Sequence, residues 1–275
     1  MILPALDASF AWHTTAAGPA LVCRALQPFA AHFFTTRAWA LGSPAGNGTA
    51  PASWEEVAAQ LGVPGGLARL HQVHGNRAIR AAATAAAPLA DADIVIADDP
   101  AIGVAVQAAD CVPLLLADRR SGAVAAAHAG WRGMAARVPR SVIAAMREAF
   151  ATRPEDLVAA LGPSIGACCY EVGPDVYDAF AAAGFSVSDL ERWFFREPQP
   201  SSINPSMPLP ARRADRWFFD GWTSVASQLE AEGILSTQIF GAGLCTASHA
   251  DLLPSYRRDG RAAGRIAGAI TARRP

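Results

Sequence analysis

The stretch from Gly103 to Gly133, GVAVQAADCVPLLLADRRSGAVAAAHAGWRG, most constrains what this 275-residue chain can fold into. It predicts three apolar strands, which span Ile102 to Gln107, Val112 to Ala117 and Ala123 to Ala127. A buried strand has no local use for polar or reactive side chains, yet five follow the strand ends: Asp110, Cys111, His128, Trp131 and Arg132. Because α/β proteins carry their chemistry at strand ends, we take this stretch as the candidate active site.

Composition narrows the classes of function. Hydrophobic residues make up 52% of the chain, enough for one large domain with a substantial core. The 23 basic and 24 acidic residues give a net charge of −1, so no basic face for nucleic acid is expected. Every basic residue is arginine, which excludes a Schiff-base lysine, a P-loop lysine and a pyridoxal phosphate anchor.

The cysteines and the N-terminus indicate a cytoplasmic protein. Five cysteines are an odd number, in a chain too large to need disulfide staples, so we expect reduced thiols. No positive residue precedes Arg24, no long apolar run follows the start, and no apolar segment approaches the length of a membrane span. We therefore expect neither a signal peptide nor a membrane partner.

The remaining pattern predicts one domain. Residues 1–20 are expected to be a peripheral segment and residues 21–275 the catalytic domain, since the linker-like stretches are too short to divide it. Helices are expected over Trp54 to Leu61 with Ser53 as cap, Pro139 to Phe150, Pro174 to Ala183 and Gly221 to Glu232. Strands are expected over Leu67 to Val73 and Ala78 to Ala82. The Gly75-Asn76 pair between them suggests a hairpin-like turn that would place His74 at a strand end.

His74, Cys111 and His128 form a candidate metal set. Their separations, 111 − 74 = 37 and 128 − 111 = 17, are too long for a zinc finger but suit ligands from different strand ends. Two histidines and one cysteine fit a catalytic zinc with an open position. Two alternatives stay open: a nucleophilic Cys111 with His128 as its base, or an unrelated thiol and two hydrogen-bonded histidines. On a strand, His71 would point away from His74, as a structural histidine.

Copper chemistry and serine chemistry fit the sequence less well. A multicopper oxidase needs a cluster built largely from histidines, and the chain has six, of which His13 and His32 are poorly placed. Gly162-Pro163-Ser164-Ile165-Gly166 matches the G-x-S-x-G nucleophile elbow, but no helical spacing follows it, so a binding loop that uses backbone amides is expected instead. Four arginines are candidates for an anion site: Arg37, Arg132, Arg257 and Arg258.

Several motifs in order resemble the laccase-domain (YfiH-like) family, whose members are also called polyphenol oxidases or purine nucleoside phosphorylases. The matching runs are Gln72-Val73-His74-Gly75, Ala109-Asp110-Cys111-Val112-Pro113, His128-Ala129-Gly130-Trp131-Arg132-Gly133, Gly162 to Gly166 with Tyr170-Glu171-Val172-Gly173, Cys245-Thr246, and Ser255-Tyr256-Arg257-Arg258-Asp259. The resemblance implies an α/β fold, a single-domain layered α/β/β/α sandwich with mixed sheets. It also implies zinc held by His74, Cys111 and His128.

The same resemblance implies phosphorolysis of adenosine, inosine, guanosine and methylthioadenosine, together with adenosine deamination. Cys111, Asp110, Arg132 and Glu171 are then the catalytic candidates, with the carboxylates moving protons. Phosphate would be bound by Arg37, Arg132, Arg257 or Arg258. Alternatives within the family are a zinc amide hydrolase that edits peptidoglycan precursors and a copper-dependent polyphenol oxidase. We expect a monomer or homodimer that binds a nucleoside and phosphate.

One departure bears on the substrate. Family members usually follow Thr-Arg with a Gly-Gly-x-Ser loop and a long segment, whereas Arg37 is followed here by Ala38-Trp39-Ala40 and a short segment up to Trp54. If that loop shapes the pocket, this chain's substrate range differs from its relatives'.

Overall fold

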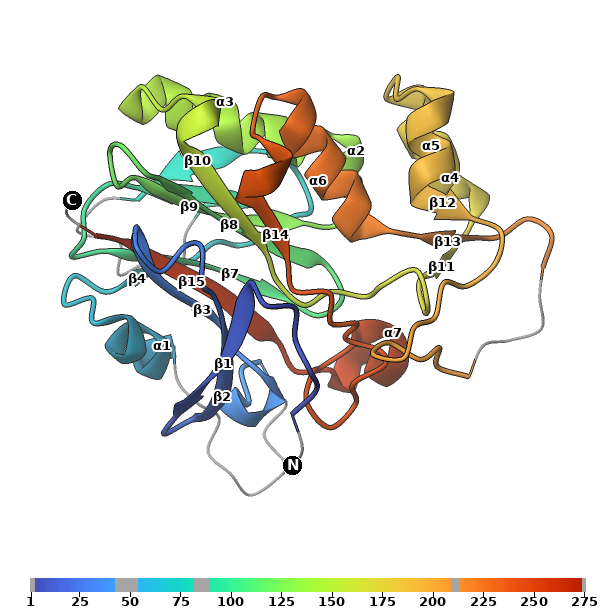
Figure 1. Cartoon of the computed structure of the whole chain (residues 1–275), viewed down its shortest axis with the longest axis horizontal. Coiled ribbons are helices and arrows are strands. Elements are labelled where there is room, and N and C mark those ends of the chain that lie inside the picture. The colour runs from blue at the N-terminus through green and yellow to red at the C-terminus, as the bar shows by residue number, and fades with distance from the viewer. Residues whose placement is uncertain (1–2, 43–53, 82–89, 209–212, 274–275) are drawn as a thin grey trace.

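The computed structural model describes residues 3–42, 54–81, 90–208 and 213–273. Two six-stranded sheets stack face to face, with helices α3 (Val138–Phe150) and α6 (Gly221–Ala231) on the outer face of one and α1 (Trp54–Leu61) on the outer face of the other (Figure 1). The expected layered α/β/β/α sandwich with mixed sheets is confirmed.

The sheet next to α1 is built from both ends of the chain. Its order is β1 (Phe10–Thr15), β2 (Gly18–Cys23), β3 (Ala30–Phe34), β15 (Ile266–Ala272), β7 (Gly103–Ala108) and β4 (Leu67–Ala68). All neighbours are antiparallel except β4 and β7. The C-terminal strand therefore lies in the middle of the sheet, between β3 and β7.

The second sheet carries the strands that lead into the candidate site. Its order is β14 (Ile239–Gly241), β10 (Leu157–Leu161), β8 (Val112–Asp118), β9 (Val124–Ala129), β6 (Ile94–Ala97) and β5 (Ala78–Arg80). A small third sheet joins β11 (Glu171–Val172), β13 (Trp217–Phe219) and β12 (Phe194–Phe195). The first two sheets enclose the main core.

The remaining helices are short. They are α2 (Trp131–Ala135), α4 (Pro174–Ala182), α5 (Val187–Trp193) and α7 (Tyr256–Asp259), with 3-10 turns η1 (Arg37–Trp39), η2 (Pro154–Asp156), η3 (Ser236–Gln238) and η4 (Gly260–Ala262). Within the described ranges, no helix combines the length and the apolar character that a membrane crossing requires.

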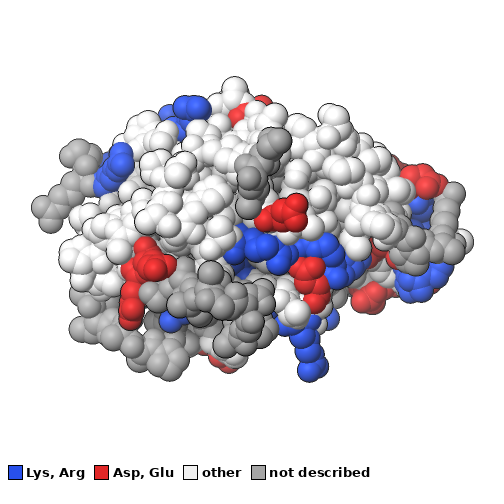
Figure 2. All heavy atoms as spheres, turned by 90° about the horizontal axis from the view of Figure 1, so that it is seen from below, with Lys and Arg blue, Asp and Glu red and all other residues white. Residues whose placement is uncertain are grey.

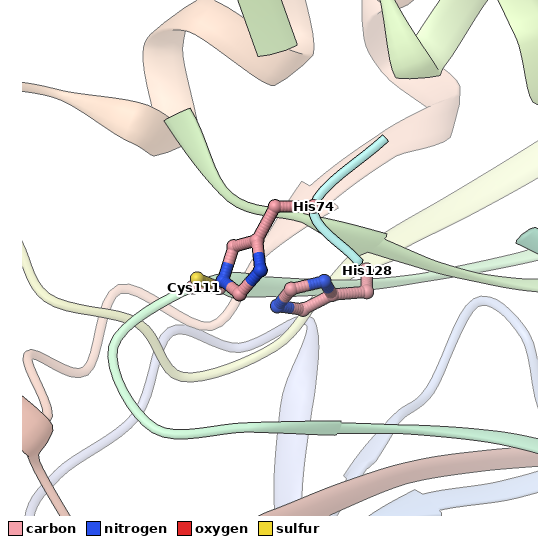
Figure 3. A group of neighbouring side chains, drawn as sticks. All are labelled: His74, Cys111 and His128. Atoms are coloured by element: carbon pink, nitrogen blue, oxygen red, sulfur yellow. The ribbon is translucent and has the colours of Figure 1, made fainter. Parts of the chain in front are cut away.

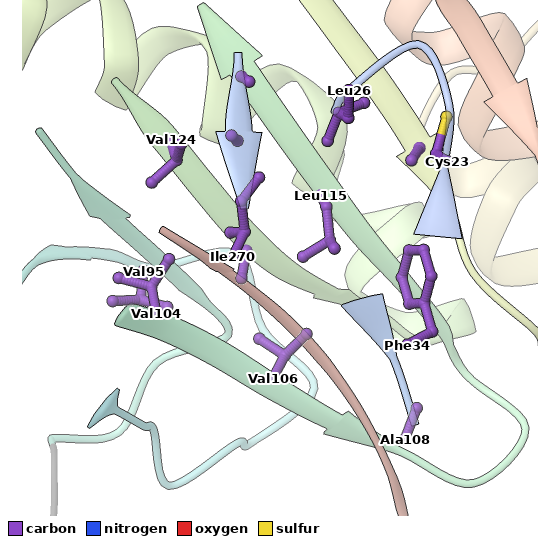
Figure 4. Close-up of a cluster of buried hydrophobic side chains, with 14 of the residues drawn as sticks. Cys23, Leu26, Phe34, Val95, Val104, Val106, Ala108, Leu115, Val124 and Ile270 are labelled. Atoms are coloured by element: carbon purple, nitrogen blue, oxygen red, sulfur yellow. The ribbon is translucent and has the colours of Figure 1, made fainter. Parts of the chain in front are cut away.

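Burial on both faces explains the long apolar runs. In β8, Leu115 points into the core between the sheets, while Leu114 and Leu116 pack under the helices (Figure 4). The core between the sheets also receives Val104 and Val106 of β7 and Ile270 of β15. Since each buried leucine contributes about 1.5–3 kcal/mol, β8 is held firmly, and its first residues are a rigid support.

The structure corrects the expected hairpin and adds detail at the N-terminus and after Arg37. β4 and β5 belong to different sheets, so residues 69–77 cross from one sheet to the other and form no hairpin. The N-terminal residues add an edge strand, β1, and the expected boundary at residue 20 lies inside β2. Trp39 is buried in the core beneath α1, so this part of the altered segment after Arg37 serves packing. Residues 43–53, with the expected cap Ser53, lie outside the described ranges.

Candidate functional site

His74, Cys111 and His128 meet in space. Their ligand atoms all lie within 4.8 Å of one another, and the two imidazole rings make an edge-to-face contact with 4.8 Å between centroids (Figure 3). His74 comes from the crossing between β4 and β5, Cys111 from the turn before β8, and His128 from β9. β8 and β9 are adjacent, with Pro113 opposite His128, so the sheet register brings Cys111 to His128.

Asp93 orients the two histidines from beneath. Its Oδ1 lies 2.8 Å from Nδ1 of His128 and accepts a 3.0 Å hydrogen bond from the backbone N–H of His74. An ionised carboxylate only accepts, so Nδ1 of His128 donates to Asp93, and Nε2 is the ring nitrogen that can bind a ligand once it has lost its own proton. A carboxylate behind a histidine in this way is typical of metal-binding histidines.

The same carboxylate fixes the turn that carries His74. Asp93 Oδ2 accepts hydrogen bonds from the backbone N–H groups of Gly75 at 2.6 Å and Val73 at 3.2 Å. His74 itself has φ of 62°, a left-handed conformation that few residues other than glycine adopt. Three N–H bonds to one buried carboxylate hold the backbone in this strained position, which points to a functional constraint on His74.

The electrostatics of the group favour an anionic sulfur. Burial raises the pKa of the Cys111 thiol, but the charge and hydrogen bonds of His128 and His74 bring it down to about 6. Burial lowers the pKa of His128, yet the Cys111 thiolate and Asp93 raise it to about 9. A thiolate beside two imidazoles suits a metal ligand or a nucleophile.

Gly130 leaves room for an ion among the three side chains. A Cβ at this position would lie 2.9 Å from Cδ2 of His74 and 3.0 Å from Sγ of Cys111. The chain therefore has no side chain where one would press on two of the three donors. Two nitrogens and one sulfur around a space kept free of carbon fit a single tetrahedral ion with one open position.

Asp110 is mostly buried, and both oxygens of its carboxylate accept hydrogen bonds from the protein. Its Oδ1 accepts a 2.6 Å hydrogen bond from the Thr246 hydroxyl and its Oδ2 one from the backbone N–H of Arg257, also 2.6 Å. Burial raises the pKa of this carboxyl, and these hydrogen bonds oppose the rise. With φ of 86°, Asp110 makes the sharp turn that presents Cys111.

A pocket of about 470 Å³ lies beside Trp131 and Arg132, the two residues that follow Gly130 in the chain. It is lined by aromatic, basic and acidic residues that include Trp131, Tyr170, Arg132, Arg257, Glu171 and Asp175. Burial raises the pKa of Tyr170, and the charges of Cys111 and Asp110 add to that rise, because the three lie close together. The pocket's lining residues do not include His74, Cys111 or His128, and Trp131 and Arg132 connect it to the group through Gly130.

The four sequence-predicted arginines separate into two pairs. Arg132 and Arg257 line the pocket, with their guanidinium carbons 4.2 Å and 5.0 Å from the ring centroids of Trp131 and Tyr170. Arg37 and Arg258 instead bind Asp259, each at 2.7 Å. Figure 2 shows basic side chains bordered by acidic ones on the face seen from below.

Glu171 and His71 also have defined surroundings. The carboxylate of Glu171 lines the pocket and lies 3.6 Å from Nη2 of Arg213. His71 is exposed and pairs with the exposed Asp91, with 2.7 Å from Nδ1 to Oδ1. It takes no part in the metal-competent group.

The expectation that the loop at Ser164 binds a ligand through its backbone amides is wrong. The N–H groups of Ser164, Ile165 and Gly166 donate to the carbonyls of Leu244 and Asp110 and to Sγ of Cys245. The Ser164 hydroxyl donates to the carbonyl of Asp110 at 2.7 Å. This loop supports the turn of Asp110 and Cys111 and has no free amides for a ligand.

Sequence reasoning missed Asp93, Arg213 and Arg216. Asp93 lies in the run Ala-Asp-Ala-Asp before β6, where an acid directly next to a buried strand was the available signal. Arg213 and Arg216 line the pocket from the segment before β13. No local pattern distinguishes them from surface arginines.

Comparison with known proteins decides the family. A family model described as multi-copper polyphenol oxidoreductase laccase matches residues 49–273. The chain belongs to this family. A family member from Synechocystis named purine nucleoside phosphorylase is 33% identical over 92% of this chain and 93% of its own length. The Escherichia coli purine nucleoside phosphorylase YfiH is 33% identical over 73% and 72%.

Other relatives agree in sequence or in fold. A Bacteroides thetaiotaomicron purine nucleoside phosphorylase is 35% identical over 65% of this chain, which spans 60% of that protein's length. A crystal structure of a Neisseria meningitidis protein has 30% identity and a TM-score of 0.70, covering 96% of this chain and 99% of that one. Bacillus licheniformis YfiH, at 22% identity, shares the fold with a TM-score of 0.79 over 95% and 99%.

Proposed function

We propose that this protein is a zinc-dependent purine nucleoside phosphorylase that also deaminates adenosine. The observation that carries the proposal is a His–Cys–His group in contact with Gly130, which leads directly into Trp131 and Arg132 of a pocket lined by arginines and aromatic rings. The names of relatives that match most of the chain's length support it. The substrate class is adenosine, inosine, guanosine and methylthioadenosine.

Zinc would be held by Nε2 of His128, a ring nitrogen of His74 and Sγ of Cys111. When bound it would supply Lewis-acid chemistry, polarising an oxygen group and acidifying water. The mixed donor set suits zinc, and one His–Cys group does not provide the several histidine-rich centres of a multicopper oxidase. His32 belongs to the core, where its Nε2 accepts the N–H of Cys23 at 2.9 Å.

Phosphorolysis requires phosphate beside the anomeric carbon, so that a phosphate oxygen bonds to that carbon as its bond to the purine nitrogen breaks. Arg132 and Arg257 are placed to clamp the phosphate, since guanidinium groups bind it in bidentate fashion. Trp131 and Tyr170 offer ring faces to the purine. Both arginines rest on these rings, so ligand entry would shift the guanidinium groups toward the anion.

The departing purine takes up a proton, and deamination moves protons between water and the amino group. Glu171 and Asp175 are carboxylates that line the pocket, and we assign the transfer of these protons to Glu171. Asp110 has both oxygens occupied by Thr246 and Arg257, so we assign it the positioning of Cys111 and Arg257. Arg37 and Arg258 would stabilise the local structure through their ion pairs with Asp259 and would not bind phosphate.

The test is incubation of the pure protein with adenosine, with and without phosphate, resolving adenine, ribose-1-phosphate and inosine. We expect adenine and ribose-1-phosphate only with phosphate, and inosine in both cases. Cys111→Ala should lose zinc and both activities. A zinc-free Cys111→Ala variant with full activity would overturn the proposal.

Two further arms address the metal and the clamp. Arg132→Ala should impair phosphorolysis more than deamination, and equal losses would contradict its phosphate role. Oxygen uptake with a phenol after loading with copper, but no phosphorolysis with zinc, would favour the polyphenol oxidase. Release of an amino acid from a peptidoglycan precursor would favour the amide hydrolase.

A further inference from the structure

A second group of metal-competent side chains lies apart from the first. Cys168 and Cys169 follow β10 and Cys245 follows β14, and all three thiols are buried and free. Their sulfur atoms lie within 4.8 Å of one another. In the described ranges, this and the His–Cys–His group are the two such clusters of metal-ligating residues.

The surroundings of the sulfurs present hydrogen-bond donors. The backbone N–H of Gly166 donates to Sγ of Cys245 at 3.3 Å, and that of Met207 donates to Sγ of Cys169, also at 3.3 Å. The Ser248 hydroxyl, whose hydrogen goes to the carbonyl of Pro205, lies 3.6 Å from the sulfurs of both Cys168 and Cys169, so its oxygen can only accept from their thiols. The hydrogen bonds from Cys168 and Cys169, together with the amide of Gly166, lower the pKa of Cys245 and make it the thiolate of the cluster.

Buried thiolates need a compensating positive charge. The guanidinium of Arg258 donates to the carbonyls of Thr246 and Ala247, the two residues after Cys245, and so leans toward the cluster without reaching a sulfur. His249 is turned to Asn204, with 3.3 Å between Nε2 and Oδ1. A cation bound by the three sulfurs themselves would supply the missing charge.

We propose that Cys168, Cys169 and Cys245 form a three-thiolate site for a soft monovalent cation, with Cu(I) as the ion that fits. Thiolate ligands suit Cu(I), zinc and iron–sulfur clusters, and a set of three sulfurs without a fourth ligand favours Cu(I) among these. Zinc prefers a fourth ligand, and the hydroxyl of Ser248 already donates to the carbonyl of Pro205 at 2.7 Å. Apolar and aromatic neighbours, Ile165, Ala247 and Trp222 among them, keep the site dry.

An ion here would join two loops, the one at Cys168 and Cys169 that leads to the pocket residue Tyr170 and the one at Cys245. Cys168 and Cys169 lie two residues or fewer before Tyr170, and Cys245 precedes Thr246, whose hydroxyl holds Asp110. The segment at Asn204 is already tied in, because its side chain donates to the carbonyl of Gly243 and accepts the N–H of Cys245. The site is therefore structural, and binding releases the thiol protons to solvent.

The experiment titrates Cu(I) anaerobically, in competition with a chromogenic Cu(I) chelator. The background is full-length protein carrying His74→Ala and Cys111→Ala, which removes the first group. We expect one Cu(I) per chain on this background and at least about 100-fold weaker binding when Cys168→Ser and Cys169→Ser are added. Cys23→Ser changes a buried cysteine of β2 that is not part of the three-sulfur group, so it is the matched control and should retain the Cu(I).

Two measurements keep the test decisive if the double variant folds poorly. X-ray absorption of Cu(I) on the His74→Ala and Cys111→Ala background should show sulfur neighbours and no nitrogen. Cu(I) should also raise the melting temperature of that protein. Unchanged Cu(I) binding in the folded Cys168→Ser and Cys169→Ser protein, nitrogen neighbours, or retention of Zn(II) in preference to Cu(I) would each overturn the proposal.

Discussion

The two groups of metal-competent side chains differ in access and in how their donors are held. In the first, His74 is exposed and His128 buried, and the carboxylate of Asp93 orients both. In the second, all three thiols are buried, and backbone N–H groups donate hydrogen bonds to the sulfurs of Cys245 and Cys169. A reactive centre needs an approach for substrate, whereas an ion that joins two loops needs none. The exposed His74 therefore agrees with the catalytic role that we propose for the first group, and the burial of all three thiols agrees with the structural role that we propose for the second.

The largest effect is expected from Gly130→Ala, which adds a carbon between the donors of the first group. Its Cβ would lie 2.9 Å and 3.0 Å from His74 and Cys111, and both side chains would have to move. We expect metal binding at this group and nucleoside cleavage to fall by about 100-fold or more, since ligand positions must hold to about 0.5 Å. Metal content and phosphorolysis rates provide the check.

Gly241→Ala is the control for that change. Nothing lies within 4 Å of a Cβ at position 241, so metal content and activity should match the wild type. Cu(I) binding by Cys168, Cys169 and Cys245 should survive in both variants. If Gly130→Ala also removed it, the two groups would not be independent.

The second prediction tests orientation. Asp93→Asn removes the charge behind His128 and weakens the hydrogen bonds to the turn of His74, so metal affinity at the first group should fall by about 10–100-fold. Asp91→Asn is the matched control, because Asp91 makes the same carboxylate–histidine contact with His71 on the surface. It should leave metal affinity unchanged and shift stability by less than about 0.5 kcal/mol. Similar losses in both variants would contradict the role of Asp93.

The third prediction compares two adjacent arginines. Arg257 lines the pocket, whereas Arg258 binds Asp259 and backbone carbonyls of the neighbouring loops. Arg257→Ala should raise KM for phosphate by about 10-fold with little change in stability, because Arg257 lines the pocket. Arg258→Ala should leave that KM near its wild-type value and lower the free energy of unfolding by about 2–3 kcal/mol. It removes hydrogen bonds to the carbonyls of Thr246, Ala247 and Leu253 and the ion pair with Asp259. Phosphate titrations and urea unfolding distinguish the two, and an exchange of the two phenotypes would refute the assignment.

These pairs also show which features of the site the sequence alone could predict. The apolar runs of β8 and β9 and the reactive residues at their ends were predictable, because strand burial and strand ends are local patterns. Asp91 and Asp93 are two residues apart in one run, yet one is exposed and the other is fully buried under His128. Arg257 and Arg258 are adjacent and face different partners. Such differences depend on contacts with residues far away in sequence, which a local pattern does not contain.

The second cluster illustrates the same limit. Cys168 and Cys169 lie about 76 residues before Cys245, and the parallel pairing of β10 with β14, continued by the bridge from Ser164 to Cys245, brings them together. The pairing of two strands so distant in sequence was not expected from the cysteine count, which indicated only reduced thiols.

The smallest expected effect is on the stability of the protein at acid pH, through the ion pairs of Asp259 with Arg37 and Arg258. The hydrogen bond from Arg258, together with Arg37, lowers the pKa of Asp259 from 3.8 to about 2, despite the opposing effect of burial. A carboxyl with a lowered folded-state pKa contributes stability above its unfolded pKa and loses it as the pH falls through the folded value. The contribution should be about 1–2 kcal/mol at pH 7 and should fade between pH 4 and pH 2. Asp259→Asn removes it, so urea unfolding should show a gap from the wild type at pH 7 that narrows toward pH 3. If the difference in the free energy of unfolding between the wild type and Asp259→Asn stayed constant with pH, Asp259 would act by shape and hydrogen bonding alone. Its charge would then contribute nothing to stability.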